Sequence, residues 1–165
     1  MQMGPDDTQV LPLAQADTTA TRCRFYRQVC GLAVVVQPEH GGRIIVPTGS
    51  VGAITMPAQL GASVKNHMLT RTMRLGPIVS HPRSKRWSFL IRPDVPDDMR
   101  LFAELFRLNV CMSPFGAQIA LPSPVCGPIS FRTWVQAPRD SFRPSGLAVV
   151  ESIRACTGPS APRKA

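Results

Sequence analysis

Three cations and a tryptophan gather around one short turn near the middle of the chain. The segment His81-Pro82-Arg83-Ser84-Lys85-Arg86-Trp87 contains all four side chains. Guanidinium and ammonium groups bind phosphate oxygens, and an aromatic ring stacks on an unpaired base. The turn therefore predicts phosphate contacts by Arg83, Lys85 and Arg86, with Trp87 as a candidate stacking residue. The alternative for Trp87 is the core, because strand alternation places it on the same face as Phe89 and Ile91.

Other cations lie close to predicted strands and loops and complete the candidate nucleic-acid-binding set. Each has a structural alternative: a helix C-terminus, an ordinary sheet surface or a local ion pair with Asp140 also accounts for such residues. The additional candidates are Arg71, Arg74, Arg132, Arg139 and Arg143.

Residues for catalysis or metal binding are sparse. The five cysteines are scattered without a CxxC pair, and His40, His67 and His81 are isolated from one another. We therefore predict no metal site and no cofactor. A nucleophile and base built from His81 with Ser80 or Ser84 would lack a nearby carboxylate to orient the ring. The cluster Asp94, Asp97 and Asp98 is better explained by the start of a helix.

Net charge indicates the class of partner. The chain of 165 residues has a formal charge of +9, and 16 of its 19 cations are arginines. Nucleic acid is therefore the first expected partner, DNA before RNA, and an acidic protein partner is the alternative. No apolar run is long enough to cross a membrane, and the N-terminus is acidic where a secretory signal would be basic. We expect no membrane partner and a cytoplasmic location.

Strand and helix patterns alternate between two polar ends. We predict tails at residues 1–19, which are acidic, and 157–165, with one α+β domain at residues 20–156. A mixed or antiparallel sheet with helices packed mainly on one face fits the alternation best. The predicted helices cover residues 21–30, about 57–70, about 97–107 and 145–156. The predicted strands are residues 32–37, 43–46, 51–56, 76–81, 86–92, 117–121 and 131–135.

Apolar spacing predicts which helix residues face the core. In the helix that begins at Pro57, Leu60, Val64 and Met68 continue a four-residue repeat from Met56. Asp97 is predicted to cap the next helix, with Arg100 and Glu104 paired on its outer side. Ser145 is predicted to cap the last helix. The residues expected to face inward in these two helices are Leu101, Phe102, Leu105, Phe106, Leu147, Val150 and Ile153.

Three segments in order resemble the N-terminal domain of bifunctional primase–polymerases, in the archaeo-eukaryotic primase superfamily. They are Thr48-Gly49-Ser50-Val51-Gly52-Ala53-Ile54-Thr55-Met56-Pro57, then Gly76-Pro77-Ile78-Val79 with Arg86-Trp87-Ser88-Phe89, then Gly116-Ala117-Gln118-Ile119-Ala120-Leu121-Pro122-Ser123-Pro124 with Phe131-Arg132-Thr133-Trp134. The resemblance covers about residues 30–138 and implies a single domain of that fold.

The catalytic positions of that family are not acidic here. Ile54 and Met56 stand where the family has two metal-binding aspartates, and Trp87 stands closest to its histidine. Divalent metals in such enzymes need carboxylates. The resemblance therefore implies a catalytically inactive relative that binds nucleic acid through arginine-rich loops. The alternative is a protein–protein accessory module of a replication or transcription complex, with Phe115, Phe131 and Phe142 as its exposed apolar candidates.

Overall fold

The described part of the chain folds into four α-helices and two antiparallel sheets, which confirms the predicted α+β class. The structure is a computed structural model that describes residues 17–124 and 132–158. The predicted tails fall mostly outside these residues, as do Phe131 and the start of the strand expected there. Within the described part of the chain, no helix is both long and apolar enough to span a bilayer.

A five-stranded sheet forms the middle of the molecule. Its strand order is β6-β3-β5-β4-β8, and every neighbouring pair is antiparallel. The short edge strand β6 was not predicted, because two residues carry no periodic signal. The strands are β3 (Gly52–Pro57), β4 (Ile78–His81), β5 (Arg86–Ile91), β6 (Cys111–Met112) and β8 (Thr133–Gln136).

A second, three-stranded sheet pairs segments that are distant in sequence. Its order is β1-β2-β7, again antiparallel. The 3-10 turn η1 (Pro38–His40) connects the first two strands, and Gly41 follows it with φ of 71°, a left-handed conformation suited to glycine. The strands are β1 (Val35–Gln37), β2 (Arg43–Pro47) and β7 (Gln118–Ala120).

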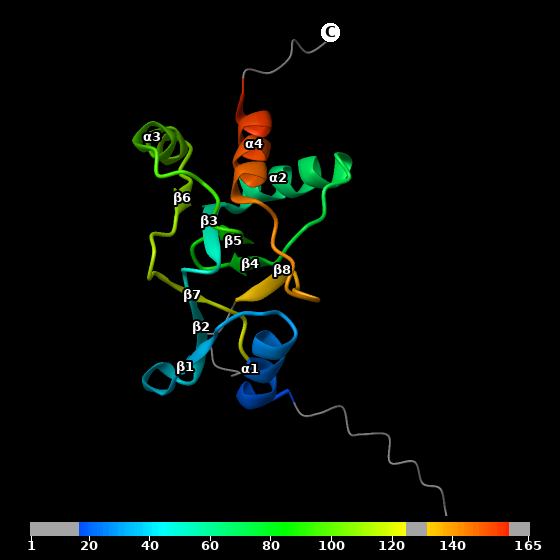
Figure 1. Cartoon of the computed structure of the whole chain (residues 1–165), viewed down its shortest axis with the longest axis vertical. Coiled ribbons are helices and arrows are strands. Elements are labelled where there is room, and N and C mark those ends of the chain that lie inside the picture. The colour runs from blue at the N-terminus through cyan, green and yellow to red at the C-terminus, as the bar shows by residue number, and fades with distance from the viewer. Residues whose placement is uncertain (1–16, 125–131, 159–165) are drawn as a thin grey trace, which may run out of the picture.

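Strand alternation divides the buried side chains of the five-stranded sheet between two cores. Ile54 and Phe89 face one side, where α2 (Ala58–Thr70) and α4 (Gly146–Thr157) cover them. Ala53 and Leu90 face the other side, beneath α1 (Thr19–Gln28) and the three-stranded sheet. Figure 1 shows α2 and α4 on one side of this sheet and α1 with β1 and β2 on the other.

Helix α1 is joined to the sheet through a buried hydroxyl. The Oη of Tyr26 donates to the backbone oxygen of Pro122 at 2.7 Å and accepts from Nε1 of Trp134 at 3.1 Å. The helix begins two residues before the predicted start, because Thr18 and Thr21 form a reciprocal capping box. Trp134 thus packs against the core beneath α1, while its neighbour Val135 packs against the core on the other side of the sheet.

Helix α3 (Met99–Arg107) differs from the prediction in its N-terminal cap and in the exposure of its outer face. Asp98, not Asp97, caps it by accepting from the backbone N–H of Arg100. Leu101 and Leu105 are buried as expected, but Phe102 is only half-buried and Phe106 is 80% exposed. The apolar stripe is wider than the surface that the sheet covers, so its outer half remains in solvent.

Three further predictions that involve α4 or its contacts are wrong. Glu104 does not pair with Arg100; its carboxylate accepts from Nε and Nη2 of Arg154 on α4, at 2.9 and 2.8 Å. Ser145 occupies the N-cap position without a side-chain capping bond. Leu147 is 42% exposed rather than buried, whereas Val150 and Ile153 are buried as predicted.

Candidate functional site

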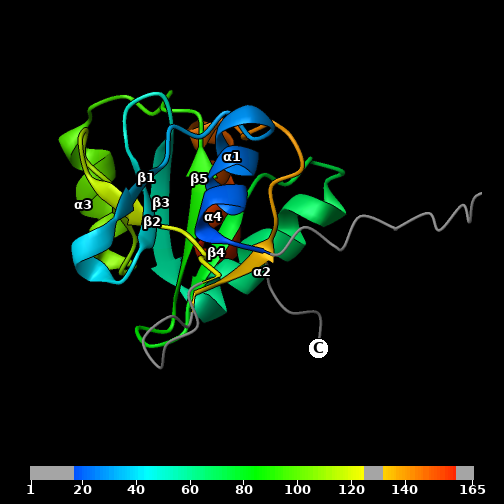
Figure 2. The ribbon, with the colours of Figure 1, turned by 90° about the horizontal axis from the view of Figure 1, so that it is seen from below.

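Arginines from two strands, one turn and the segment just before β8 lie near the face of the five-stranded sheet that also bears α1. We call Arg43, Arg83, Arg86 and Arg132 the basic face. The charges of Arg43 and Arg83, after burial, lower the pKa of Arg132, so the three guanidinium groups lie within electrostatic reach of one another. Arg83 belongs to the turn between β4 and β5, which lies at the lower edge of the molecule in Figure 2. Sequence reasoning named three of these four arginines and missed Arg43.

Hydrogen bonds hold three of these arginines in place through neutral acceptors. Nη2 of Arg86 donates to the backbone oxygens of Thr55 and Asn109, at 3.1 and 2.9 Å. Nε and Nη2 of Arg43 donate to Oε1 of Gln37. Nε of Arg132 donates to Nδ1 of His81 at 3.1 Å. The guanidinium groups are therefore positioned without being neutralised.

A chain of polar side chains crosses the sheet beneath the basic face. Nδ1 of His81 accepts from Arg132, which has no acceptor, so the ring proton lies on Nε2. Nε2 then donates to Oγ of Ser88 at 2.9 Å, and Ser88 shares a 2.8 Å bond with Oγ1 of Thr55. The sequence did not predict this series of hydrogen-bonded side chains, because its members become neighbours only through strand pairing.

The basic face keeps His81 neutral. Burial, with the charges of Arg132 and Arg86, lowers the pKa of His81 from 6.5 to about 4. A neutral ring is the acceptor that Arg132 needs, whereas a charged ring would repel it. We infer that His81 positions Arg132, since Arg132 bonds to Nδ1 of the ring and Ser88 holds the ring from Nε2.

Stability is expected to depend on the protonation of His81. As the pH falls through about 6.5 the unfolded chain takes up a proton, whereas the folded chain resists until about pH 4. The unfolded state therefore binds more protons in this window, and the free energy of unfolding decreases as the pH falls from 6.5 to 4. His81→Gln should flatten this decrease in urea titrations. An unchanged slope in that window would contradict the inference.

Trp87 is held away from the basic face. Its side chain projects to the opposite side of β5, where it packs against Gly61 of α2 and the core beneath that helix. This placement favours the core alternative over base stacking.

The remaining predicted cations form a separate group near the C-terminal end of α2. Arg74 pairs with Asp140 and lies 4.2 Å from the ring centroid of Phe142. Nη1 of Arg143 donates to the backbone oxygen of Cys30 at 3.2 Å. Arg71 follows the last turn of α2, and Arg139 lines a small cavity beside Arg74. About 20 Å of helix separates this group from the β4–β5 turn, which meets the other end of α2.

The positions that resemble metal-binding aspartates lie in the core. Ile54 and Met56 are fully buried on the side of β3 covered by α2 and α4, while Ala53 and Thr55 face the opposite side. Among the residues that the structure describes, no three His, Cys, Asp or Glu side chains are grouped closely enough to hold a metal ion.

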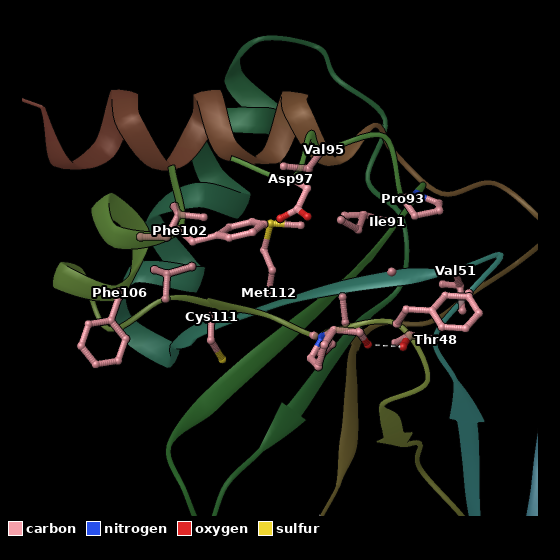
Figure 3. Close-up of a pocket in the computed structure, with 18 residues that line it drawn as sticks. Thr48, Val51, Ile91, Pro93, Val95, Asp97, Phe102, Phe106, Cys111 and Met112 are labelled. Atoms are coloured by element: carbon pink, nitrogen blue, oxygen red, sulfur yellow. Dashed lines mark hydrogen bonds between the residues drawn. The ribbon is translucent and has the colours of Figure 1, made fainter. Parts of the chain in front are cut away.

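An apolar groove of about 700 Å³ lies on the other edge of the molecule, between α3 and the segments that flank β3 and β6. Phe102 and Phe106 line one side of it, and Met112 and Phe115 contribute from the segments opposite α3. Figure 3 shows the Asp97 carboxylate beside this groove, near the start of α3. Phe115 is 91% exposed, as its loop position predicted.

Compared with protein-family models, curated proteins and solved structures, the chain matches none of them. Its function must therefore be argued from the geometry of its own surface.

Proposed function

We propose that the chain binds the phosphate backbone of nucleic acid, DNA in the first instance, through the basic face. The observation that carries this proposal is the uncompensated charge of Arg43, Arg86 and Arg132. Arg43 lies in β2, Arg86 in β5 and Arg132 just before β8, and within residues 17–124 and 132–158 none of the three forms an ion pair with a carboxylate. Closely spaced cations with neutral partners attract a polyanion strongly.

The hydrogen bonds of the basic face support phosphate binding by preorganisation. Arg86 uses Nη2 for its two backbone carbonyls, so Nε and Nη1 remain for an incoming oxygen. Arg132 uses Nε for His81 and keeps both Nη groups. A guanidinium that is already oriented loses less side-chain entropy on binding. Contacts of this type position a duplex or single strand without reading its sequence.

We further propose that the domain is a degenerate relative of primase–polymerases and has no nucleotidyl-transfer activity. Support comes from the apolar side chains of Ile54 and Met56, which are buried in the core, because Mg²⁺ binds oxygen ligands and neither side chain offers one. A shift of the alignment by one residue would substitute Ala53 and Thr55, which offer no carboxylate either.

Removing two cations from the β4–β5 turn should weaken binding at low salt. We choose Arg83→Gln with Lys85→Asn, because Lys85 has φ of 55° and asparagine tolerates that conformation. Both residues are exposed, so the variant should fold normally. We expect weaker binding of a labelled duplex by fluorescence anisotropy, and a salt slope smaller by about 1, because Arg83 is the residue of this pair that belongs to the basic face.

The matched control removes the same charge elsewhere. Arg24→Gln with Arg71→Gln alters two exposed positions at the outer face of α1 and the end of α2. We expect near wild-type binding from this variant. Equal losses in the two double variants would contradict the assignment of the basic face, because they would show a diffuse effect of net charge.

A protein–protein accessory module is the second candidate function. The exposed ring of Phe115 favours it, because this ring adjoins the apolar groove beside α3, and contiguous exposed apolar surface marks interaction sites. Phe142, the other candidate within the described residues, lies beneath Arg74 and offers less apolar surface. Pull-down with wild type and Phe115→Ser would test this function independently of nucleic acid.

A further inference from the structure

The outer side of α3 carries an apolar stripe that nothing in the described chain covers. Met99 is 78% exposed and Phe106 is 80% exposed, and the small exposed residue Ala103 lies between them. Their spacing of four and three residues places them on one helix face. Such a stripe on a short helix is typical of an interface between proteins.

This stripe borders the apolar groove, so α3 presents an exposed apolar face and also forms one side of the groove. Phe102 and Phe106 line the groove from the helix (Figure 3). Phe115 lines it from the loop before β7. A second helix laid along α3 would bury the exposed faces of Phe106 and Phe115 together. It would need apolar side chains at the spacing of this stripe.

The charges at the two ends of α3 indicate which second helix would pack along it. Asp97 and Asp98 precede the helix, with Arg100 in its first turn, and Arg107 ends it, so the net charge is negative at the first end and positive at the second. Within the described residues neither Asp97 nor Arg107 forms an ion pair. If two copies of α3 lie antiparallel, Arg107 of each meets the acidic end of the other, and Phe106 of each meets Met99 of the other. A parallel arrangement would place like charges together.

We propose that the chain forms a twofold-symmetric dimer in which α3 packs antiparallel against the partner's α3. Ala103 lies near the symmetry axis, where a small side chain permits close approach. Phe106 enters the partner's groove, and Arg107 pairs with the partner's Asp97. The contact is isologous, so every interaction occurs twice. The helix is only about 13 Å long, so the dimer is expected to be reversible and concentration-dependent.

Sedimentation velocity without nucleic acid tests the dimer. The sedimentation coefficient of the wild type should increase with concentration toward that of a dimer. Phe106→Ser should raise the dissociation constant at least about tenfold, because aromatic side chains at the centre of an interface contribute most to binding. Phe25→Ser, at an exposed position of α1, is the matched control and should dimerise as the wild type does.

A charge exchange tests the antiparallel arrangement. Asp97→Lys and Arg107→Glu should each weaken dimerisation, and the double variant should restore it, because the exchanged charges again face each other. A wild type that stays monomeric at the highest concentration would overturn the proposal and leave the groove to another partner or an apolar ligand. Survival of the dimer in Phe106→Ser, or failure of the double variant to recover, would also overturn it.

Discussion

Raising the salt concentration from about 50 mM to about 200 mM is expected to weaken duplex binding about 100-fold. Each phosphate contact releases condensed counterions, and the logarithm of the affinity falls with the logarithm of salt at a slope of about −0.9 per contact. The basic face offers Arg43, Arg83, Arg86 and Arg132, so about four contacts are expected. Anisotropy titrations at several salt concentrations measure the slope directly.

Single-stranded DNA provides an internal comparison for this prediction. Its lower charge density reduces the slope to about −0.7 per contact, so the same protein should show a shallower dependence on the single strand. Circular dichroism at each salt concentration verifies that the fold is unchanged. Affinity that does not respond to salt would contradict phosphate recognition by the basic face.

Replacing Gly61 with valine is expected to lower the free energy of unfolding by about 3 kcal/mol. A Cβ atom at this position would lie 2.8 Å from Cε3 of Trp87 and 3.2 Å from its Cβ, closer than side-chain atoms pack. The ring lies between α2 and β5, so the helix would have to move away from the sheet. For a domain of this size the expected decrease in Tm is about 10 °C.

Ala62→Val is the matched control, because the neighbouring residue is exposed and on the same helix. It introduces the same β-branched side chain without the contact to Trp87. Helix propensity alone would favour valine over glycine at position 61 and disfavour it over alanine at position 62, so a larger loss at Gly61 reports the contact with Trp87. Equal urea midpoints for the two variants would contradict the close packing of α2 on Trp87. A second variant, Gly61→Val with Trp87→Leu, should recover part of the lost stability by removing the clash.

Most elements of the fold follow from local patterns. Val64 and Met68 repeat at helical spacing and are buried under the sheet, and Phe89 and Ile91 alternate along a strand as predicted. Strand β6 escaped prediction, because a two-residue element exists only through its pairing with β3. The division of the strands into two sheets was also not predicted, since β2 pairs with β7 across more than 70 positions of the chain.

The outer faces of helices were predicted less well than the inner ones. An apolar residue at helical spacing indicates that a face can be buried, not that another element reaches it. Phe106 and Leu147 satisfy the pattern and remain exposed, because the sheet beneath α3 and α4 covers only part of each helix. Ion pairs show the same limitation of local patterns. The spacing along α3 predicts a pair between Glu104 and Arg100, but Glu104 pairs with Arg154 on the neighbouring helix α4.

The amino-acid sequence alone determined the α+β class, the large positive charge and the cationic turn between two strands. These depend on local periodicity and composition, which are properties of contiguous residues. Tertiary structure alone decided which cations lie close to one another. It joined Arg43 and Arg132 to the turn, directed Trp87 into the core and kept His81 neutral between two guanidinium groups. Strand pairing brings these residues together across the sheet, and electrostatic interactions depend on distance in space rather than along the chain.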